Sequence, residues 1–442
     1  MNERATRVRR IPPAVLAVLI LLVATPPATP APAVHREVLP NGIVLLVAER
    51  PAIPIVAVRV YTHAGAVNDP PDRAGLANLT GALLTRGTAK RTGQQLDSAI
   101  EFVGGRVDAG AGRDGLVVWL SVLKRDLTLG LDLLGEVVLT PAFPEAELKR
   151  KVTEIQAGLQ RMEENPGAVA SRALAKLVFP GHPYGMPVEG TRESVGALTR
   201  DDVVRFYREH ARPDATIVAV VGAVTVDEAR REILARFGAW PRPTTPPAAV
   251  PVAAPGPAPR REAITRDLTQ TTVLLGRQGV TQSDPDYYPL TVASYILGGG
   301  STSRLYTRVR DEGGLAYDVR SHLAPGKHGA RFLVSTQTRA AEAAKAVAFI
   351  EEELNRMRRD PVTERELTSA KDYLIGSFPL RLDTSSKMAD FIVAVEDLGL
   401  GLDYADRYRE VIGRVTAADV QRVAAKYFDP AGFNRVLVGK AP

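Results

Sequence analysis

The sequence predicts an α+β fold built from two homologous domains that a proline-rich linker joins. Its 442 residues exceed the usual size of one domain, and apolar strands alternate with amphipathic helices throughout. One local pattern also occurs twice: Thr199 and Thr416 each stand three residues before an aspartate and 14 residues before a proline. A threonine followed by an acidic residue at the third position is typical of a helix N-terminus. We therefore expect the second half of the chain to repeat the first.

The first domain is predicted to comprise residues 34–240. Asn41-Gly42 is the strongest short signal of a β-hairpin, and it predicts a strand pair within residues 38–47. Runs rich in β-branched residues predict further strands at 55–61, 116–123 and 217–221. Apolar residues at helical spacing predict helices at 96–103, 127–139, 145–162 and 227–237, in addition to the helix that Thr199 caps.

Residues 241–261 (PRPTTPPAAVPVAAPGPAPRR) are predicted to form the linker. The prolines favour an extended spacer that has no core of its own. The second domain, residues 262–442, then repeats the outline of the first. Helices predicted at 288–297 and 366–378 take the places of the first domain's central helix and of its 145–162 helix. A strand at 434–438 matches the strand at 217–221.

Residues 1–33 are predicted to be a secretory signal peptide. Four arginines precede an apolar run of 11 residues, and Ala31-Pro32-Ala33 supplies the small residues of a cleavage site. The run is too short to span a bilayer comfortably, although an uncleaved anchor is the alternative. We expect a periplasmic protein that makes no stable membrane insertion after the signal is removed.

Charge and cysteine content exclude several classes of function. The signal holds four Arg and one Glu of a chain whose formal charge is +6, so the mature chain carries +3. This balance, without any basic run, argues against nucleic acid as a partner. The chain has no cysteine, which excludes disulfides, a thiol nucleophile and a cysteine-type metal site.

The stretch 75–88 (GLANLTGALLTRGT) predicts a helix with two different faces. Leucines at helical spacing form the first face. The second face contains no acid, no histidine and no nucleophile, since it consists of Asn78, Gly81 and Ala82. A glycine within a helix costs about 0.5–1 kcal/mol relative to alanine, so Gly81 requires an explanation.

This stretch resembles the motif G-L-A-H-x-x-E-H-x-L-x-x-G-T of the pitrilysin/insulinase-like (M16) zinc peptidases. Asn78, Gly81 and Ala82 stand where the family has its first histidine, its catalytic glutamate and its second histidine. Glu154, within the predicted 145–162 helix, matches the family's third zinc ligand. The resemblance covers about residues 36–440. It implies two α/β-roll domains in the family's half-clamshell arrangement.

The three departures imply that this chain binds no zinc by itself. A catalytic zinc site needs about three protein ligands and an open position for water, and a single carboxylate does not supply them. Gly81 also offers no base that could activate water. Glu154 is then expected to be a solvated or locally paired carboxylate. His63 and His182 lack partners at ligand spacing, and we interpret them as turn or core residues.

The second domain contains a glycine-rich loop that the family resemblance associates with the substrate. The loop comprises Gly298, Gly299, Gly300 and Ser301, and Arg304 follows it closely. It is not a phosphate-binding loop, because no Gly-Lys-Ser/Thr follows the glycines. We expect these residues to approach a peptide substrate, although a purely structural role is the simpler interpretation of Arg304.

Arg310 and Tyr317, seven residues apart, match an arginine and a tyrosine of the family. The resemblance implies that this pair holds the tetrahedral intermediate of peptide hydrolysis. A guanidinium and a phenol are suitable donors to a developing oxyanion. The alternative is that both side chains only form local contacts, for example with Asp311.

These features together predict the non-zinc subunit of a heterodimeric endopeptidase. The family resemblance includes heterodimers in which one subunit holds zinc and the other supplies the arginine and the tyrosine. Arg310 and Tyr317 are then expected to act on peptide substrates in the site of a zinc-bearing homologous partner. The alternative is a non-catalytic scaffold or peptide-binding protein of the same fold, and an autonomous peptidase is the third hypothesis.

Overall fold

The computed structural model describes residues 33–247 and 249–440. The predicted signal peptide, residues 1–33, therefore lies almost entirely outside the described residues. Within those residues, every helix is too short or too polar to span a bilayer.

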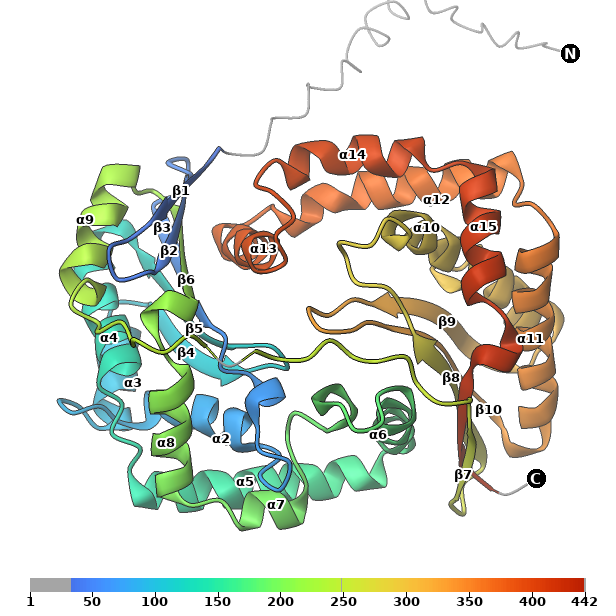
Figure 1. Cartoon of the computed structure of the whole chain (residues 1–442), viewed down its shortest axis with the longest axis horizontal. Coiled ribbons are helices and arrows are strands. Elements are labelled where there is room, and N and C mark those ends of the chain that lie inside the picture. Colours follow the sequence, from blue (N-terminus) through green and yellow to red (C-terminus); the bar gives the residue numbers. More distant parts are fainter. Residues whose placement is uncertain (1–32, 248, 441–442) are drawn as a thin grey trace, which may run out of the picture. The chain divides into compact units, whose positions relative to one another are not determined.

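Two β-sheets organise the described residues (Figure 1). The first has the strand order β1-β2-β6-β3-β5-β4, and the second has the order β7-β11-β8-β10-β9. The strands of the first sheet are β1 (Val34–Val38), β2 (Val44–Glu49), β3 (Ile55–Thr62), β4 (Arg106–Ala111), β5 (Leu116–Leu123) and β6 (Thr216–Gly222). Those of the second are β7 (Arg261–Thr265), β8 (Gln270–Gln278), β9 (Ala316–Ala324), β10 (Arg331–Arg339) and β11 (Asn434–Gly439).

Apart from β1, the two sheets have the same connectivity. With β1 left out, the first strand of each sheet in chain order pairs parallel with the last, β2 with β6 and β7 with β11. All other neighbouring strands of both sheets pair antiparallel. The predicted α+β fold with a repeated plan is therefore confirmed.

Helices cover the sheets and occur mostly where the apolar spacing predicts them. The first half contains α2 (Leu76–Leu83), α3 (Gly93–Phe102), α4 (Leu127–Leu139), α5 (Glu145–Glu164), α6 (Pro166–Val178), α7 (Arg192–Gly196), α8 (Arg200–His210) and α9 (Val226–Phe237). The second half contains α10 (Tyr287–Gly298), α11 (Ala343–Arg359), α12 (Glu364–Ser377), α13 (Ser385–Asp397), α14 (Tyr404–Arg414) and α15 (Ala417–Tyr427). Thr199 and Thr416 form the capping boxes that the repeated pattern predicts, and they start α8 and α15.

Each half of the chain contributes one helix to the sheet of the other half. Helix α13 packs on β3 and β6 of the first sheet, and α6 packs on β8 and β11 of the second (Figure 1). The apolar side of α13, from Met388 to Val393, is buried with residues of β2, β3 and β6. Ion pairs border this apolar contact: Arg59 Nε lies 2.5 Å from Asp390 Oδ1, and Arg36 lies 2.8 Å from Glu396. The two halves therefore complete each other's cores.

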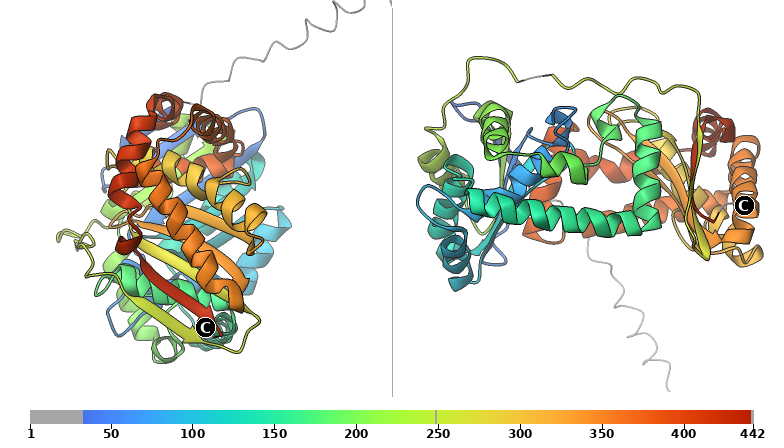
Figure 2. Two further views of the ribbon diagram at one scale, coloured as in Figure 1. Left: turned by 90° about the vertical axis from the view of Figure 1, so that its right-hand side faces the viewer. Right: turned by 90° about the horizontal axis from the view of Figure 1, so that it is seen from below.

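Helix α5 leads from the first half to α6. It contacts α2 near one end and α6 at the other, and Figure 2 (right) shows it as a long straight helix. The side chain of Asn165 ends α5 and begins α6, because its Oδ1 accepts the N–H groups of Gly167 and Ala168. This junction sets the direction in which α6 reaches the second sheet.

The predicted linker has no regular structure at 241–247 and 249–260, and its last residue, Arg261, already begins β7 (Figure 2). Its backbone is nevertheless held in place. The Ala253 N–H donates to the His328 carbonyl at 2.7 Å, and His182 Nε2 lies 2.9 Å from the Pro251 carbonyl. Val250 and Ala253 also pack on the apolar cluster around α6. The segment is more than the spacer that its prolines predict, because apolar residues between the prolines pack against the cluster around α6.

The exchange of α6 and α13 predicts that the linker is not required to keep the halves together. We expect a chain cut at a protease site inserted after the exposed Thr244 to remain one particle, because each half still buries the other's helix. Native mass spectrometry and size-exclusion chromatography measure this. Ile392→Asp, which places a charge in the α13 contact, is the matched variant that should let the cut halves separate. Separation of the cut chain without this substitution would contradict the prediction.

Candidate functional site

The helix that carries the degenerate motif, α2, is fixed at its N-terminus by Asp69. The backbone N–H groups of Gly75 and Ala77 donate to the Asp69 carboxylate, each at 2.8 Å. Gly75 adopts φ +95°, which lets the chain turn sharply into the helix. Burial raises the pKa of the Asp69 carboxyl to about 7, against the opposing effect of these backbone donors. The helix is therefore positioned by a half-buried acid that no motif in the sequence marks.

Gly81, one of the three degenerate positions on α2, faces β4. Asn78 and Ala82 are half-buried, and Gly81 is buried. A Cβ atom added at Gly81 would lie 2.6 Å from the Ala111 nitrogen and 2.8 Å from the Gly110 carbonyl carbon, both in β4. No side chain fits at such distances from backbone atoms. Gly81 is thus explained by the close approach of α2 to β4, and a glutamate at this position has no room in this packing.

Glu154, which matches the family's third zinc ligand, lies on α5 and is exposed. Its carboxylate lies 2.9 Å from Lys151 Nζ and 3.5 Å from a guanidinium nitrogen of Arg150. The hydrogen bond from Lys151 lowers the pKa of Glu154. Among residues 33–247 and 249–440, no three His, Cys, Asp or Glu side chains come close enough together to hold a metal ion. The donor set around α2 therefore does not fit a catalytic zinc.

Arg310 and Tyr317 come together at one end of the second sheet. Arg310 lies in the π-helical segment η6 (Tyr306–Glu312), and Tyr317 lies near the start of the edge strand β9. The Arg310 Cζ lies 4.9 Å from the centroid of the Tyr317 ring. Tyr317 is 84% exposed, so its side chain is open to solvent. The sequence-predicted pair is thus adjacent, and its phenol is accessible.

The pair lines a polar cleft of about 780 Å³. The walls of this cleft come from β8, β9 and β10 and from the α5–α6 junction at Asn165. Arg339 is the second arginine of the lining, and its guanidinium lies 3.5 Å from the Gly314 carbonyl. An extended peptide placed in this cleft meets several donors beside the exposed edge of β9.

The glycine-rich loop has a packing role, and none of its predicted substrate-binding residues lines the cleft. A Cβ at Gly298 would lie 2.4 Å from the Ser321 nitrogen of β9, and one at Gly299 would lie 2.5 Å from the Tyr295 ring. Gly300 also faces Tyr295, and Ser301 is exposed. The loop therefore lets the end of α10 approach β9. Its contact with substrate remains a prediction.

Arg304, the other residue that we expect to approach substrate, is engaged within the protein. Its guanidinium donates to both carboxylate oxygens of Glu366 on α12, at 2.6 and 3.0 Å. Burial alone would raise the pKa of Glu366, but the bonds from Arg304 and Thr363 lower it to about 2. The structure thus favours the structural interpretation of Arg304.

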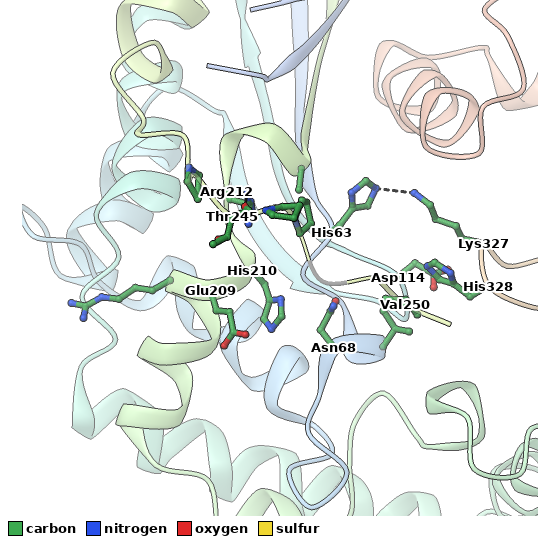
Figure 3. A pocket seen from close by; sticks show the side chains of 16 residues that line it. His63, Asn68, Asp114, Glu209, His210, Arg212, Thr245, Val250, Lys327 and His328 are labelled. Carbon is green, nitrogen blue, oxygen red and sulfur yellow. Dashed lines mark hydrogen bonds between the residues drawn. The ribbon is translucent and has the colours of Figure 1, made fainter. Parts of the chain in front are cut away.

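A second cavity, of about 420 Å³, lies where β3, α8, the linker and the β9–β10 loop meet (Figure 3). His63 Nε2 lies 2.6 Å from Asp397 Oδ1 and 3.0 Å from Lys327 Nζ, and Lys327 Nζ lies 2.6 Å from the same Asp397 oxygen. Although burial opposes it, the hydrogen bonds from His63 and Lys327 lower the pKa of Asp397. Because Asp397 belongs to α13, this cluster joins the two halves. No motif in the sequence indicates this cluster, since its members are far apart in the chain.

His182, the other histidine interpreted as a turn residue, lies in a turn. Its Nδ1 accepts the N–H of Tyr184 at 3.1 Å. Tyr184 is buried, and its hydroxyl donates to Asp114 at 2.6 Å and accepts the His328 N–H at 3.1 Å. The turn thus helps to hold the β4–β5 connection against the β9–β10 loop.

Comparison with known proteins identifies relatives over nearly all of the described chain. The model of the insulinase family (peptidase family M16) matches residues 44–192, and the model described as the peptidase M16 inactive domain matches residues 197–374. An uncharacterized zinc protease of Mycobacterium leprae is 32% identical over 358 residues, which cover 80% of each chain. Another uncharacterized zinc protease, from Streptomyces coelicolor, is 29% identical and covers 88% of this chain and 86% of its own.

Solved structures show the same fold. The peptidase M16 inactive domain from Pseudomonas fluorescens has a TM-score of 0.88 at 25% identity and covers 93% of this chain and 98% of its own. A protease from Helicobacter pylori has a TM-score of 0.84 at 21% identity and covers 93% of this chain and 100% of its own. These likenesses confirm the predicted family resemblance and the two-domain fold.

The contact between α2 and β4 predicts whether replacing Gly81 raises or lowers the free energy of unfolding. We expect Gly81→Ala to lower the free energy of unfolding by about 1–3 kcal/mol, because the new methyl group must displace β4. Gly158→Ala in α5 is the matched control, since its Cβ meets only the end of the Arg161 side chain at 3.8 Å. That variant should gain about 0.5–1 kcal/mol. Urea unfolding measures both, and a stabilised Gly81→Ala chain would contradict the described packing.

The raised pKa of Asp69 predicts a pH dependence of stability. The folded chain binds this proton more tightly than the unfolded chain, whose aspartate has a pKa of about 3.9. Its contribution to the free energy of unfolding is therefore largest below about pH 4 and declines as the pH rises to about 7. We expect Asp69→Asn to remove this component, so that its unfolding free energy declines less than that of the unmodified chain between pH 4.5 and 7.5. Asp72→Asn, at an exposed neighbouring carboxylate, is the control, and identical slopes for all three chains would refute the assignment.

Proposed function

This chain belongs to the M16 (insulinase) family of peptidases, and we propose that it is the non-zinc subunit of a periplasmic heterodimeric endopeptidase. A homologous partner would carry the intact zinc motif, and this chain would supply Arg310 and Tyr317 to the hydrolysis of peptides. The relatives named above are described as zinc proteases, whereas this chain has Asn78, Gly81 and Ala82 at the motif positions. A role in peptide hydrolysis thus requires another polypeptide to provide the metal.

The main observation behind the proposal is that the Arg310 guanidinium has no acceptor among the described residues. The Arg310 guanidinium forms no hydrogen bond or ion pair with any other described residue, although Arg310 lines the polar cleft. Its N–H groups are thus free to donate to a ligand oxygen. The exposed Tyr317 hydroxyl provides a second donor beside it. Two donors that converge on one cleft are what a tetrahedral oxyanion requires.

A local role of the pair, which was the alternative at the sequence level, receives less support. Asp311 does not bind Arg310 in the described structure, and Arg310 contacts aromatic rings instead of a carboxylate. By contrast, the guanidinium groups of Arg304 and Arg308 both form ion pairs with glutamates. A scaffold without catalytic function would not need an arginine in this cleft without a protein acceptor.

The proposal predicts a specific loss of activity in the assembled enzyme. We expect the tagged chain to co-purify with a zinc-bearing homologue from the periplasmic fraction, its N-terminus close to residue 34. In that complex, Arg310→Ala should lower kcat by about 10²–10³-fold with little change in KM, because the guanidinium acts on the oxyanion. Arg320→Ala, at an exposed arginine of β9 that pairs with Asp318, is the matched control. A complex whose activity is unchanged by Arg310→Ala would favour the non-catalytic scaffold hypothesis. A lone chain that binds one zinc and cuts peptides would overturn the proposal.

A further inference from the structure

The guanidinium of Arg310 lies over two aromatic rings. Its Cζ is 4.6 Å from the centroid of the Tyr306 ring and 4.9 Å from that of Tyr317. Both distances are within the range of cation–π attraction. Tyr317 is exposed and projects from the edge strand, whereas Tyr306 is partly buried and belongs to the same helical segment as Arg310. Tyr306 is thus the more rigidly held of the two contacts.

Tyr306 and Arg310 are four residues apart on the π-helical segment η6 and therefore lie on one face of it. In a π-helix the hydrogen bonds run from residue i to i+5, so residues four or five apart lie above one another. Single turns of this kind are rare and frequently occur at functional sites. Val309 anchors the segment in the core, and Gly314, at φ +58°, then turns the chain into β9. The backbone therefore places Tyr306 directly beneath the guanidinium.

A neighbouring arginine shows what a purely structural contact looks like. Arg308, on the same segment, lies 4.1 Å from the Phe349 ring centroid. Its guanidinium also donates to Glu312 at 3.1 Å and to Glu352 at 2.8 Å. Arg308 thus has both an aromatic contact and carboxylate acceptors, whereas Arg310 has aromatic contacts alone. A ring fixes the plane of a guanidinium and leaves the N–H groups at its edge unused.

We infer that Tyr306 is a positioning residue for Arg310. Its ring holds the guanidinium in one orientation over the cleft while all N–H donors stay available for substrate. This inference rests on the proposed function, since it assumes that Arg310 donates to the reacting peptide. Because Tyr306 acts through its ring, phenylalanine should replace it, whereas an aliphatic side chain of similar size should not.

The first test uses this chain alone and does not depend on a partner. In the chain labelled with ¹⁵N-arginine, the Nε–H resonance of Arg310 is identified by its loss in Arg310→Lys. We expect Tyr306→Leu to shift this resonance by removing a ring current, Tyr306→Phe to preserve it, and Phe349→Leu to leave it in place. A resonance that Tyr306→Leu does not move would overturn the inference and leave the proposed function intact.

The second test uses the heterodimer with its zinc-bearing partner. We expect Tyr306→Leu to lower kcat by about 2- to 30-fold with KM nearly unchanged, as the range of cation–π energies implies. Tyr306→Phe should restore the activity, and Phe349→Leu should retain it. Equal losses in the leucine and phenylalanine variants of Tyr306 would contradict a role of the ring. If Arg310→Ala itself has no effect on turnover, the proposed function fails. Equal losses in the two Tyr306 variants, by contrast, contradict only the role of the Tyr306 ring.

Discussion

The burial of α6 and α13 on the opposite sheets is the contact on which the rest of the structure depends. Each sheet has an apolar face that its own half of the chain leaves uncovered, and the foreign helix completes it. Ion pairs from Arg36 and Arg59 then fix α13 along its length, and the cluster of His63, Lys327 and Asp397 fixes its end. Because these contacts join both halves, the α5–α6 junction is held beside β8 and can form one wall of the polar cleft.

The cleft differs from the α2 face because it contains hydrogen-bond donors that have no acceptor within the described structure. Around α2, the close approach of the helix to β4 excludes a side chain at Gly81, and Glu154 is paired with lysine and arginine. At the cleft, Arg310 and Tyr317 keep their donors unbound within the described structure. The same type of helix-to-strand contact occurs in both halves, since Gly298 of α10 approaches β9 as Gly81 of α2 approaches β4. In this respect the two halves use the same packing.

Local signals predicted much of the fold. The Asn41-Gly42 hairpin, the strand 116–123, the helix 127–139 and the two threonine caps all occur where their patterns place them, because each depends on residues close in sequence. The helix exchange could not be predicted, since an apolar helix face does not specify which sheet it covers. The partners of His63 lie hundreds of residues away in the sequence, and no periodicity marks the π-helical turn that carries Tyr306 and Arg310. Arg310 and Tyr317 could be named only through the family resemblance, but their proximity follows from the short segment between them.

Gly81 also bears on how the chain can evolve. A histidine meets less steric resistance at positions 78 and 82, where the side chains are only half-buried. A carboxylate at position 81 requires α2 to withdraw from β4, and that movement brings no catalytic benefit until both histidines are present. Selection therefore has no stepwise path of improving mutations back to a metal centre. Descendants that keep this helix contact therefore keep an α2 face on which no carboxylate can take the place of Gly81.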